Sequence, residues 1–195
     1  MYLIRGQNNL KLFKSRYPDV LLSGTIGNFD GLHLGHQAIL GKIKNNAQKY
    51  NAKTIVFFTE PHAAEYFSKV RNRNQIPPPR ICPWREKVQL LKKSKIDFAC
   101  FLKFNSKLRT MPPDDFISQI LDSINLVSFT VGDDFRFGAG RKGDTDLLKN
   151  WGEKKGILVE NTETITLDGK RVSSTRIREE LLNNNFNNAE KLLGR

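Results

Sequence analysis

The sequence of 195 residues contains only two cysteines, Cys82 and Cys100, which form neither a CxxC pair nor a disulfide framework. Two free thiols are typical of a reducing compartment, so we expect a cytoplasmic protein. Long apolar runs are also lacking: the longest, residues 55–58 and 98–102, have the length of strands and cannot span a membrane. The N-terminal residues contain no apolar segment of the kind that marks a signal peptide.

Acidic residues are scarce as well. The sequence has 20 Asp and Glu against 32 Lys and Arg, which leaves a formal net charge of +12. Nearly all of the excess lies in the first hundred residues, which carry 17 basic and 6 acidic side chains. A basic half can bind nucleic acid, an anionic membrane face or a polyphosphate, although a solvated surface is the usual outcome. With 38% hydrophobic residues the chain is too apolar for a disordered protein, and we expect one globular domain over residues 1–195.

Short apolar segments alternate with helix-like segments along the chain. Strands are expected at residues 20–26, 53–59, 97–101, 127–131 and 157–160. Helices are expected at residues 36–50, 84–93, 112–124, 144–155, 174–183 and 187–193, a hairpin around Asp168-Gly169, and a long irregular segment at residues 60–83. This alternation predicts an α/β fold with a doubly wound parallel sheet. Ligands of such sheets bind beyond the carboxyl ends of the strands, here the loops at residues 27–36, 59–80, 132–143 and 173–178.

The loop at residues 27–36, GNFDGLHLGH, is the first that could carry chemistry. His33 and His36 enter the start of a predicted helix, where free N–H groups and the helix dipole favour an anion. Both rings could donate hydrogen bonds to phosphate oxygens. An ordinary turn and a metal site are the alternatives, but two histidines without further ligands make a poor zinc site. We expect no functional role for His62, which follows Pro61 in a loop.

The segment VSSTRIR at residues 172–178 is the second candidate. The hydroxyls of Ser174 and Thr175 stand at a predicted helix start, and Arg176 and Arg178 follow. Hydroxyls, free backbone N–H groups and guanidinium groups together would cradle a phosphate. The alternative is a helix cap followed by two surface arginines.

The loop at residues 132–144, GDDFRFGAGRKGD, is the third. Asp133 and Asp134 could bind ribose hydroxyls, an amino group or Mg²⁺. Phe135 and Phe137 offer aromatic faces, which are costly in a polar loop unless they cover something apolar. A solvated loop is the alternative.

The motifs GNFDGLHLGH, VGDDFRFGAGRKGD and VSSTRIR, in this order and spacing, resemble the FMN adenylyltransferase (FAD synthetase) module of the bacterial bifunctional riboflavin kinase/FAD synthetase family. The resemblance runs from about residue 20 to residue 195. It also includes Arg80-Ile81 ahead of the helix that carries Lys87. Two further points of resemblance are Phe104 at the end of a strand and the segment Asp115-Phe116-Ile117. It implies a Rossmann-like sheet of the nucleotidyltransferase type, with ATP and FMN as small-molecule substrates and Mg²⁺ bound through the phosphates rather than by protein ligands.

The resemblance also implies a mechanism, in which an FMN phosphate oxygen attacks the α-phosphorus of ATP in line and pyrophosphate leaves. His33 and His36 would then be the catalytic residues that stabilise the developing charge. The ATP and phosphate contacts would come from Gly27, Asn28, Phe29, Asp30, Gly35, Ser174, Thr175, Arg176 and Arg178. The flavin or nucleotide pocket would be formed by Asp133, Asp134, Phe135 and Phe137.

The sequence departs from the family pattern in three places. Chains of the family continue into a riboflavin kinase barrel, whereas this sequence ends at Arg195 and lacks the kinase's Pro-Thr-Asn signature, so we expect no phosphorylation of riboflavin and a riboflavin kinase domain only as a missing partner. Residues 58–62 contain one residue more than the family's usual Phe-Glu-Pro run, and residues 69–79 are unusually basic.

Three other functions fit parts of the sequence. The histidine motif serves a whole superfamily, so another adenylyl- or cytidylyltransferase with a different phosphorylated acceptor is the main alternative. A nucleic-acid-binding module would explain the basic residues at 69–80, but no recognised nucleic-acid motif is present. A non-catalytic flavin or nucleotide sensor is disfavoured because His33 and His36 are intact. The sequence contains no GxxxxGK[ST] motif, which argues against a P-loop ATPase.

Overall fold

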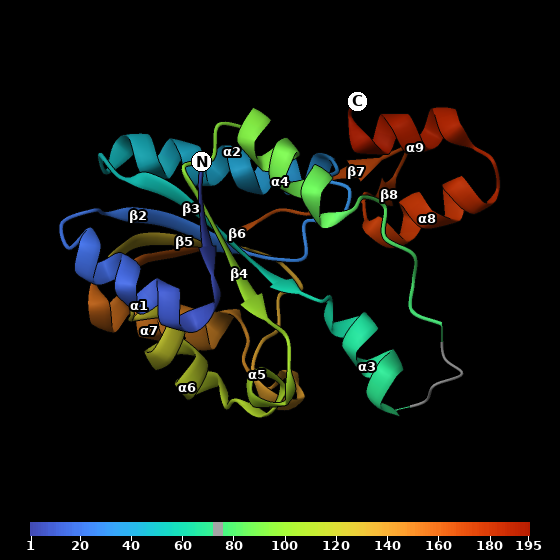
Figure 1. Ribbon diagram of the computed structural model, residues 1–195. Helices are drawn as coiled ribbons and strands as arrows, with labels where there is room; N and C mark the ends of the chain where they lie inside the picture. Colours follow the sequence, from blue (N-terminus) through green and yellow to red (C-terminus); the bar gives the residue numbers. More distant parts are fainter. Residues whose placement is uncertain (72–75) are drawn as a thin grey trace.

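The computed structural model describes residues 1–71 and 76–195, and its centre is a six-stranded parallel sheet with helices on both faces (Figure 1). The strand order is β1-β4-β3-β2-β5-β6. The strands are β1 (Tyr2–Arg5), β2 (Leu22–Ile26), β3 (Lys53–Glu60), β4 (Phe98–Lys103), β5 (Leu126–Gly132) and β6 (Leu158–Thr162). The predicted doubly wound α/β fold is therefore confirmed.

Five of the described helices form two layers that enclose the sheet. The helices are α1 (Gly6–Arg16), α2 (Leu34–Lys49), α3 (Ala63–Arg71), α4 (Trp84–Lys93), α5 (Ser106–Thr110), α6 (Pro113–Phe116), α7 (Thr145–Lys155), α8 (Ser174–Leu182) and α9 (Phe186–Leu193). Helices α2 and α4 cover one face, while α1, α6 and α7 cover the other (Figure 1). Among the described residues, no helix is both long enough and apolar enough to cross a bilayer.

Burial on both faces explains the composition of the central strands. In β3 the residues Thr54–Phe58 are all buried, as expected of a parallel strand covered by helices on both sides. Next to it, Gly24 in β2 leaves room for its neighbours, because an added Cβ would lie 2.9 Å from the side chain of Leu126. From β2 the sheet continues to β3 on one side and to β5 on the other. The carboxyl end of β2 is therefore the switch point at which ligands of such sheets bind.

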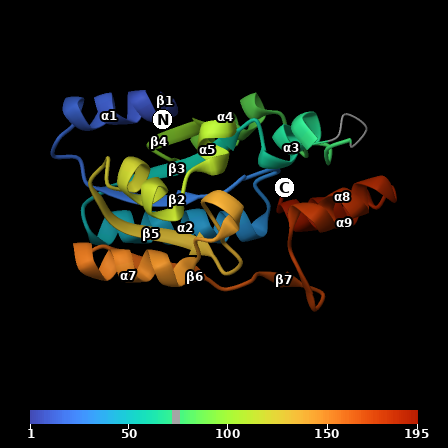
Figure 2. The same cartoon turned by 90° about the horizontal axis from the view of Figure 1, so that it is seen from below.

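A small C-terminal unit lies beyond the carboxyl ends of the strands. It consists of the hairpin β7 (Thr166–Leu167) and β8 (Lys170–Arg171) with the helices α8 and α9, and it has its own cluster of buried side chains. Figure 2 shows this C-terminal unit at the end of the sheet, next to the start of α2. It is thus placed to close the site from one side.

Two stretches differ from the sequence prediction. Residues 1–19 were assigned no element, yet β1 pairs with β4 at the edge of the sheet and α1 packs on it through Leu10 and Phe13. The irregular segment predicted at residues 60–83 is wrong in part, because α3 occupies Ala63–Arg71. Proline and basic residues suggested a loop, whereas contacts of this helix with Phe104 decide its structure. Residues 72–75, which belong to the basic stretch at residues 69–80, lie outside the described residues.

Smaller differences concern helix boundaries. The helix predicted at residues 112–124 is a short α6 followed by a π-helical turn at Ile117–Leu121. The helix α5 at Ser106–Thr110 and the 3₁₀ turn at Ala139–Arg141 were not predicted. Helix α2 begins at Leu34, two residues earlier than expected, because His33 occupies its N-cap.

Candidate functional site

A cavity of about 920 Å³ opens at the carboxyl ends of β2, β3, β5 and β6. The C-terminal unit contributes to its wall through Arg171 and the start of α8. Of the residues predicted from the sequence, the cavity is lined by Gly27, Asn28, Phe29, His33, Gly35, His36, Asp133, Asp134, Phe135, Phe137 and Ser174. Residues from all three predicted loops thus meet around one space of a size typical of small-molecule sites.

The two histidines stack on each other in the wall of the cavity, with ring centroids 3.7 Å apart. His33 is the N-cap of α2, where its Nδ1 accepts a hydrogen bond from the backbone N–H of His36 at 3.4 Å. A neutral imidazole that accepts at Nδ1 carries its proton on Nε2. The Nε2–H of His33 is therefore left to donate to a ligand.

Both histidines are neutral at physiological pH. Burial, together with the nearby Arg171, lowers the pKa of His33 to about 4. Burial also holds the pKa of His36 well below its ordinary value, and the neighbouring His33 lowers it further. The pair consequently offers N–H donors rather than two fixed positive charges, and a bound polyanion would favour their protonation.

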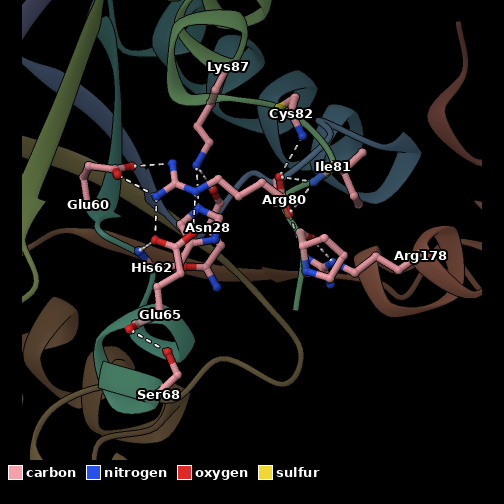
Figure 3. Close-up of polar contacts among 12 residues, drawn as sticks. Asn28, Glu60, His62, Glu65, Ser68, Arg80, Ile81, Cys82, Lys87 and Arg178 are labelled. Atoms are coloured by element: carbon pink, nitrogen blue, oxygen red, sulfur yellow. Dashed lines mark hydrogen bonds and ion pairs between the residues drawn. The ribbon is translucent and has the colours of Figure 1, made fainter. Parts of the chain in front are cut away.

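Asp30 and Arg178, both predicted to contact phosphate, are absent from the cavity lining and pair with each other. The Arg178 guanidinium donates to the Asp30 carboxylate at 2.6 Å, and the backbone N–H groups of Ile81 and Cys82 donate to the same carboxylate (Figure 3). Ser174, which does line the cavity, donates its hydroxyl to the backbone carbonyl of Asp30 at 3.1 Å. These contacts fasten the first loop to α8.

The rest of the VSSTRIR segment divides in a similar way. Ser173 is the N-cap of α8, because its hydroxyl accepts from the backbone N–H of Arg176 at 3.2 Å. Arg176 turns away to the carbonyls of Leu167 and Lys170 in the hairpin. Neither Arg176 nor Thr175 lines the cavity. Hydroxyls of this segment therefore reach the site, and its two arginines act elsewhere in this structure.

The two aspartates of the third loop contact an arginine of β8 that sequence reasoning missed. Arg171 lines the cavity and lies 3.2 Å from the carboxylate of Asp133 and 3.0 Å from that of Asp134. A hydrogen bond from Thr164, with the charge of Arg171, lowers the pKa of Asp133. The only signal in the sequence was the position of Arg171 directly before the VSST run. The cavity wall also includes Arg109, Arg136 and Arg141, which were not predicted either.

Aromatic side chains also line the cavity. The rings of Phe135 and Phe137 stack at 5.7 Å, and those of Phe67 and Phe104 meet edge to face at 5.9 Å. Phe67 lies on α3, so assigning that segment to a loop hid its contribution. The cavity therefore combines hydrogen-bond donors and cations with flat apolar surfaces, as a site for a phosphorylated aromatic ligand would.

A metal ion would need help from a ligand to bind here. Across residues 1–71 and 76–195, no group of three or more His, Cys, Asp or Glu side chains is arranged to hold a metal. The carboxylates of Asp133 and Asp134 line the cavity but are engaged by Arg171. Mg²⁺ is usually bound by one or two carboxylates together with substrate phosphates, so the residues present fit a metal carried by phosphates.

Comparisons with known proteins agree with this geometry. The family model described as FAD synthetase matches residues 20–176. The bifunctional riboflavin kinase/FMN adenylyltransferases of Pseudomonas fluorescens and Escherichia coli K12 are each 38% identical to the chain, over 100% of its length. The chain spans 60% and 59% of the length of these two curated relatives.

Two solved structures share the fold. A macrolide-efflux protein from Streptococcus pneumoniae matches with a TM-score of 0.81 and 23% identity, over 100% of this chain and 70% of its own. A pantoate-beta-alanine ligase from Francisella tularensis matches with a TM-score of 0.56 and 14% identity, over 98% of this chain and 83% of its own. At these identities the likeness extends to the fold alone.

Proposed function

The chain belongs to the FAD synthetase family, and from this premise we propose that it transfers the adenylyl group of ATP to FMN, forming FAD and releasing pyrophosphate. The observation that carries the proposal is a single cavity with a stacked histidine pair and aromatic walls. The relatives named for FMN adenylyltransferase activity support it, because they match the whole chain at 38% identity.

The two substrates would occupy different parts of the cavity. The triphosphate of ATP would lie against the first loop, where the side chains of His33, His36 and Ser174 and the backbone of Gly27–Phe29 and Gly35 line the wall. The isoalloxazine ring of FMN would lie against aromatic side chains such as Phe67 and Phe135. This arrangement brings the FMN phosphate toward the triphosphate, as an in-line attack requires.

Catalysis would rest on positioning and charge stabilisation. An FMN phosphate oxygen forms a bond to the α-phosphorus of ATP, while the bond from that phosphorus to the oxygen of pyrophosphate breaks. Negative charge grows on the phosphates as this happens. The Nε2–H of His33 and the ring of His36 stand ready to stabilise it, and Arg171 adds a positive charge at the same cavity.

Asp30 and Arg178 would act on the site by positioning the first loop. Their ion pair and the Ser174 contact join that loop to α8, so they keep the histidines and the serine hydroxyl at one place. The phosphate contacts expected of Asp30, Thr175, Arg176 and Arg178 stay predictions, since none of the four lines the cavity.

We assign no protein ligand set to Mg²⁺, which would enter with the phosphates and neutralise part of their charge. Should carboxylates contact this Mg²⁺ as well, they would be those of Asp133 and Asp134. Arg171, which pairs with both, would then turn toward the phosphates. The reducing cytoplasm is the compartment we propose, in keeping with the two buried free thiols of Cys82 and Cys100.

Chromatography of a reaction mixture tests the proposal. The protein is incubated with ATP and Mg²⁺ and with FMN, riboflavin or phosphopantetheine in parallel. We expect FAD from FMN, no flavin nucleotide from riboflavin, and no adenylation of phosphopantetheine. Adenylation of phosphopantetheine without FAD formation would move the chain to another branch of the nucleotidyltransferases. Phosphorylation of riboflavin would show that these residues carry kinase activity as well.

A further inference from the structure

Lys87, on α4, is a fully buried lysine outside the cavity lining. Its Nζ donates a hydrogen bond to the backbone carbonyl of Asn28 at 2.7 Å and lies 2.9 Å from Nε2 of His62 (Figure 3). Among the described residues, no carboxylate lies within ion-pair distance of this ammonium. A buried cation held by neutral acceptors is costly for folding, so its contacts call for an explanation beyond stability.

The first contact of Lys87 sets the orientation of a peptide group in the cavity wall. The peptide bond between Asn28 and Phe29 is trans, so the Asn28 carbonyl and the Phe29 N–H point in opposite directions. The carbonyl points to Lys87, and the Phe29 N–H therefore points away from it. Asn28 and Phe29 line the cavity and Lys87 does not, so Lys87 holds this peptide group from behind the cavity wall.

The conformation of Phe29 also needs support. Its φ of 48° lies in the left-handed region, which is unfavourable for a residue with a side chain. The ring of Phe29 is fully buried and lies 5.0 Å from the ring of His36. A rotation of the Asn28–Phe29 peptide would thus disturb the packing of the Phe29 ring against His36.

The second contact of Lys87 reaches the other part of the cavity. His62 stands at the corner between β3 and α3, and its backbone N–H donates to the Glu65 carboxylate at 3.3 Å. Arg80 binds the carboxylates of both Glu65 and Glu60, which secures the same corner (Figure 3). Helix α3 then presents Phe67 to the aromatic side of the cavity. One ammonium therefore joins the phosphate loop to the helix behind the aromatic wall.

We propose that Lys87 is a positioning residue for adenylyl transfer, which fixes the orientation of the Asn28–Phe29 peptide through the Asn28 carbonyl and holds the start of α3 through His62. The proposal rests on the proposed function. Burial and the charge of Lys87 both lower the pKa of His62, which keeps its ring neutral and able to accept from the ammonium. Lys87 thus acts through other residues and touches no substrate itself.

The substitution Lys87→Met separates positioning from folding, because it removes a buried charge and leaves an unbranched side chain only one atom shorter. Lys93→Met, at an exposed position on the same helix, is the matched control. We expect Lys87→Met to melt near the control but to lose turnover roughly a hundredfold, because a small misplacement of the first loop costs about that much. Its KM for ATP should stay within about threefold, since the histidines of that loop act mainly on the transition state.

A third variant distinguishes hydrogen bonding from packing. Lys87→Gln extends as far as Met and keeps an N–H donor, so it should retain more turnover than Lys87→Met. Equal turnover in both variants would contradict the role of donation to Asn28. Turnover of Lys87→Met equal to that of the Lys93→Met control would overturn the whole proposal.

Hydrogen exchange without substrate keeps this test separate from the proposed activity. In Lys87→Met, amide protons of residues 27–36 and 60–66 should exchange faster than in Lys93→Met, and those of the β5 region should not. If the unsubstituted protein makes no FAD, the proposed function fails, and faster exchange would still support the positioning of both segments by Lys87. Unchanged exchange in both segments would overturn it whatever the activity.

Discussion

The histidine pair shows at the scale of single residues how burial prepares a site. Stacking and capping hold His33 and His36 in one orientation, and their low pKa values keep them as neutral donors. They should therefore stabilise the transition state, in which negative charge develops on the phosphates, more than they stabilise bound ATP. We predict that His33→Ala and His36→Ala each lower kcat by roughly a hundredfold to a thousandfold and change ATP affinity far less.

The control for these variants has to lie away from the network around the site. His62→Ala is unsuitable because the His62 ring contacts Lys87. Gln48→Ala, at an exposed position near the end of α2, is a better choice. Steady-state kinetics and nucleotide titration measure the two effects. Near-normal turnover in both histidine variants would show that the loop is only a turn.

The low pKa of His33 also predicts how stability depends on pH. Between pH 6.5 and about 4 the unfolded chain binds a proton at this residue that the folded chain does not bind. Stability must therefore fall as pH is lowered through this range, by about 3 kcal/mol from this group when the whole range is crossed. Above pH 6.5 both states are neutral at His33 and the contribution is complete.

The substitution His33→Asn isolates this effect, because Asn still caps a helix but does not titrate. Denaturant unfolding of the protein and of His33→Asn near neutral pH and near pH 5 gives the difference. The unsubstituted protein should lose more stability on acidification than the variant does. Equal losses would mean that His33 titrates normally in the folded chain.

The absence of a side chain at Gly35 has a steric reason that the sequence pattern does not reveal. A Cβ at this position would lie 3.2 Å from both Cε1 and Nδ1 of the His33 ring. Gly35→Ala should therefore tilt that ring and lower kcat by roughly tenfold to a hundredfold, with little change in melting temperature. Gly41→Ala, on the same helix in open space, is the control. A Gly35→Ala variant as active as this control would show that the ring can shift at no cost.

At the scale of elements, α8 shows how a helix start serves both folding and the site. The sequence placed the cap at Ser174 or Thr175, whereas the structure gives the cap to Ser173 and turns Ser174 toward Asp30. Ser173→Ala should destabilise the protein by about 1 kcal/mol through the lost cap. Chemical denaturation measures this loss, with Ser15→Ala at an exposed position on α1 as the control. A Ser173→Ala variant as stable as the control would mean that α8 does not depend on its cap.

Helix α3 illustrates why some elements escape sequence reasoning. Its residues Ala63–Arg71 precede a basic stretch with three consecutive prolines, which suggested a loop. The helix is held instead by Tyr66 and Phe67 against Phe104, which lies about forty residues away in the chain. Tertiary contacts of this kind override weak local preferences. The segment predicted as a loop therefore contributes a wall of the cavity.

At the scale of the whole molecule, the C-terminal unit is tied to the sheet by polar contacts as well as by packing. Arg178 pairs with Asp30, Arg195 donates to the carbonyls of Gly31 and Leu32, and Gln37 donates to the carbonyl of Leu193. We therefore propose that residues 1–195 behave as one domain. Thermal unfolding should occur in a single transition, with equal midpoints by far-ultraviolet circular dichroism and by tryptophan fluorescence.

Tryptophan fluorescence reports on the sheet region alone, because Trp84 and Trp151 lie on α4 and α7. Circular dichroism also includes the helices of the C-terminal unit. A circular dichroism transition at lower temperature than the fluorescence transition would show that this unit unfolds by itself. That result would contradict the prediction of one domain.

The distribution of charge is a second property of the whole molecule. Nearly all of the excess positive charge lies in the first hundred residues, for which a solvated surface is the usual outcome. Among the described residues, the arginines that line the cavity are Arg109, Arg136, Arg141 and Arg171, all from the nearly neutral second half. A charge count along the chain therefore does not locate the site, because folding decides which charges face one space.

The sequence by itself determined the α/β fold, the family and the three loops that meet at the cavity. Alternation of strands and helices places all loops of one kind at the same edge of a parallel sheet, so local patterns were enough to bring His33, Asp133 and Ser174 together. Motif order was enough for the family, which the match over residues 20–176 confirms.

Only the tertiary structure decided which members of those loops face the cavity and what holds them. Arg178 reaches Asp30, Arg171 reaches Asp133, and Lys87 reaches Asn28 across intervals that no periodicity in the sequence encodes. Local patterns report on neighbours within a turn of helix or a pair of strands. Side-chain partners from distant segments depend on how the layers pack, and so do the pKa values and the orientation of the peptide groups that they control.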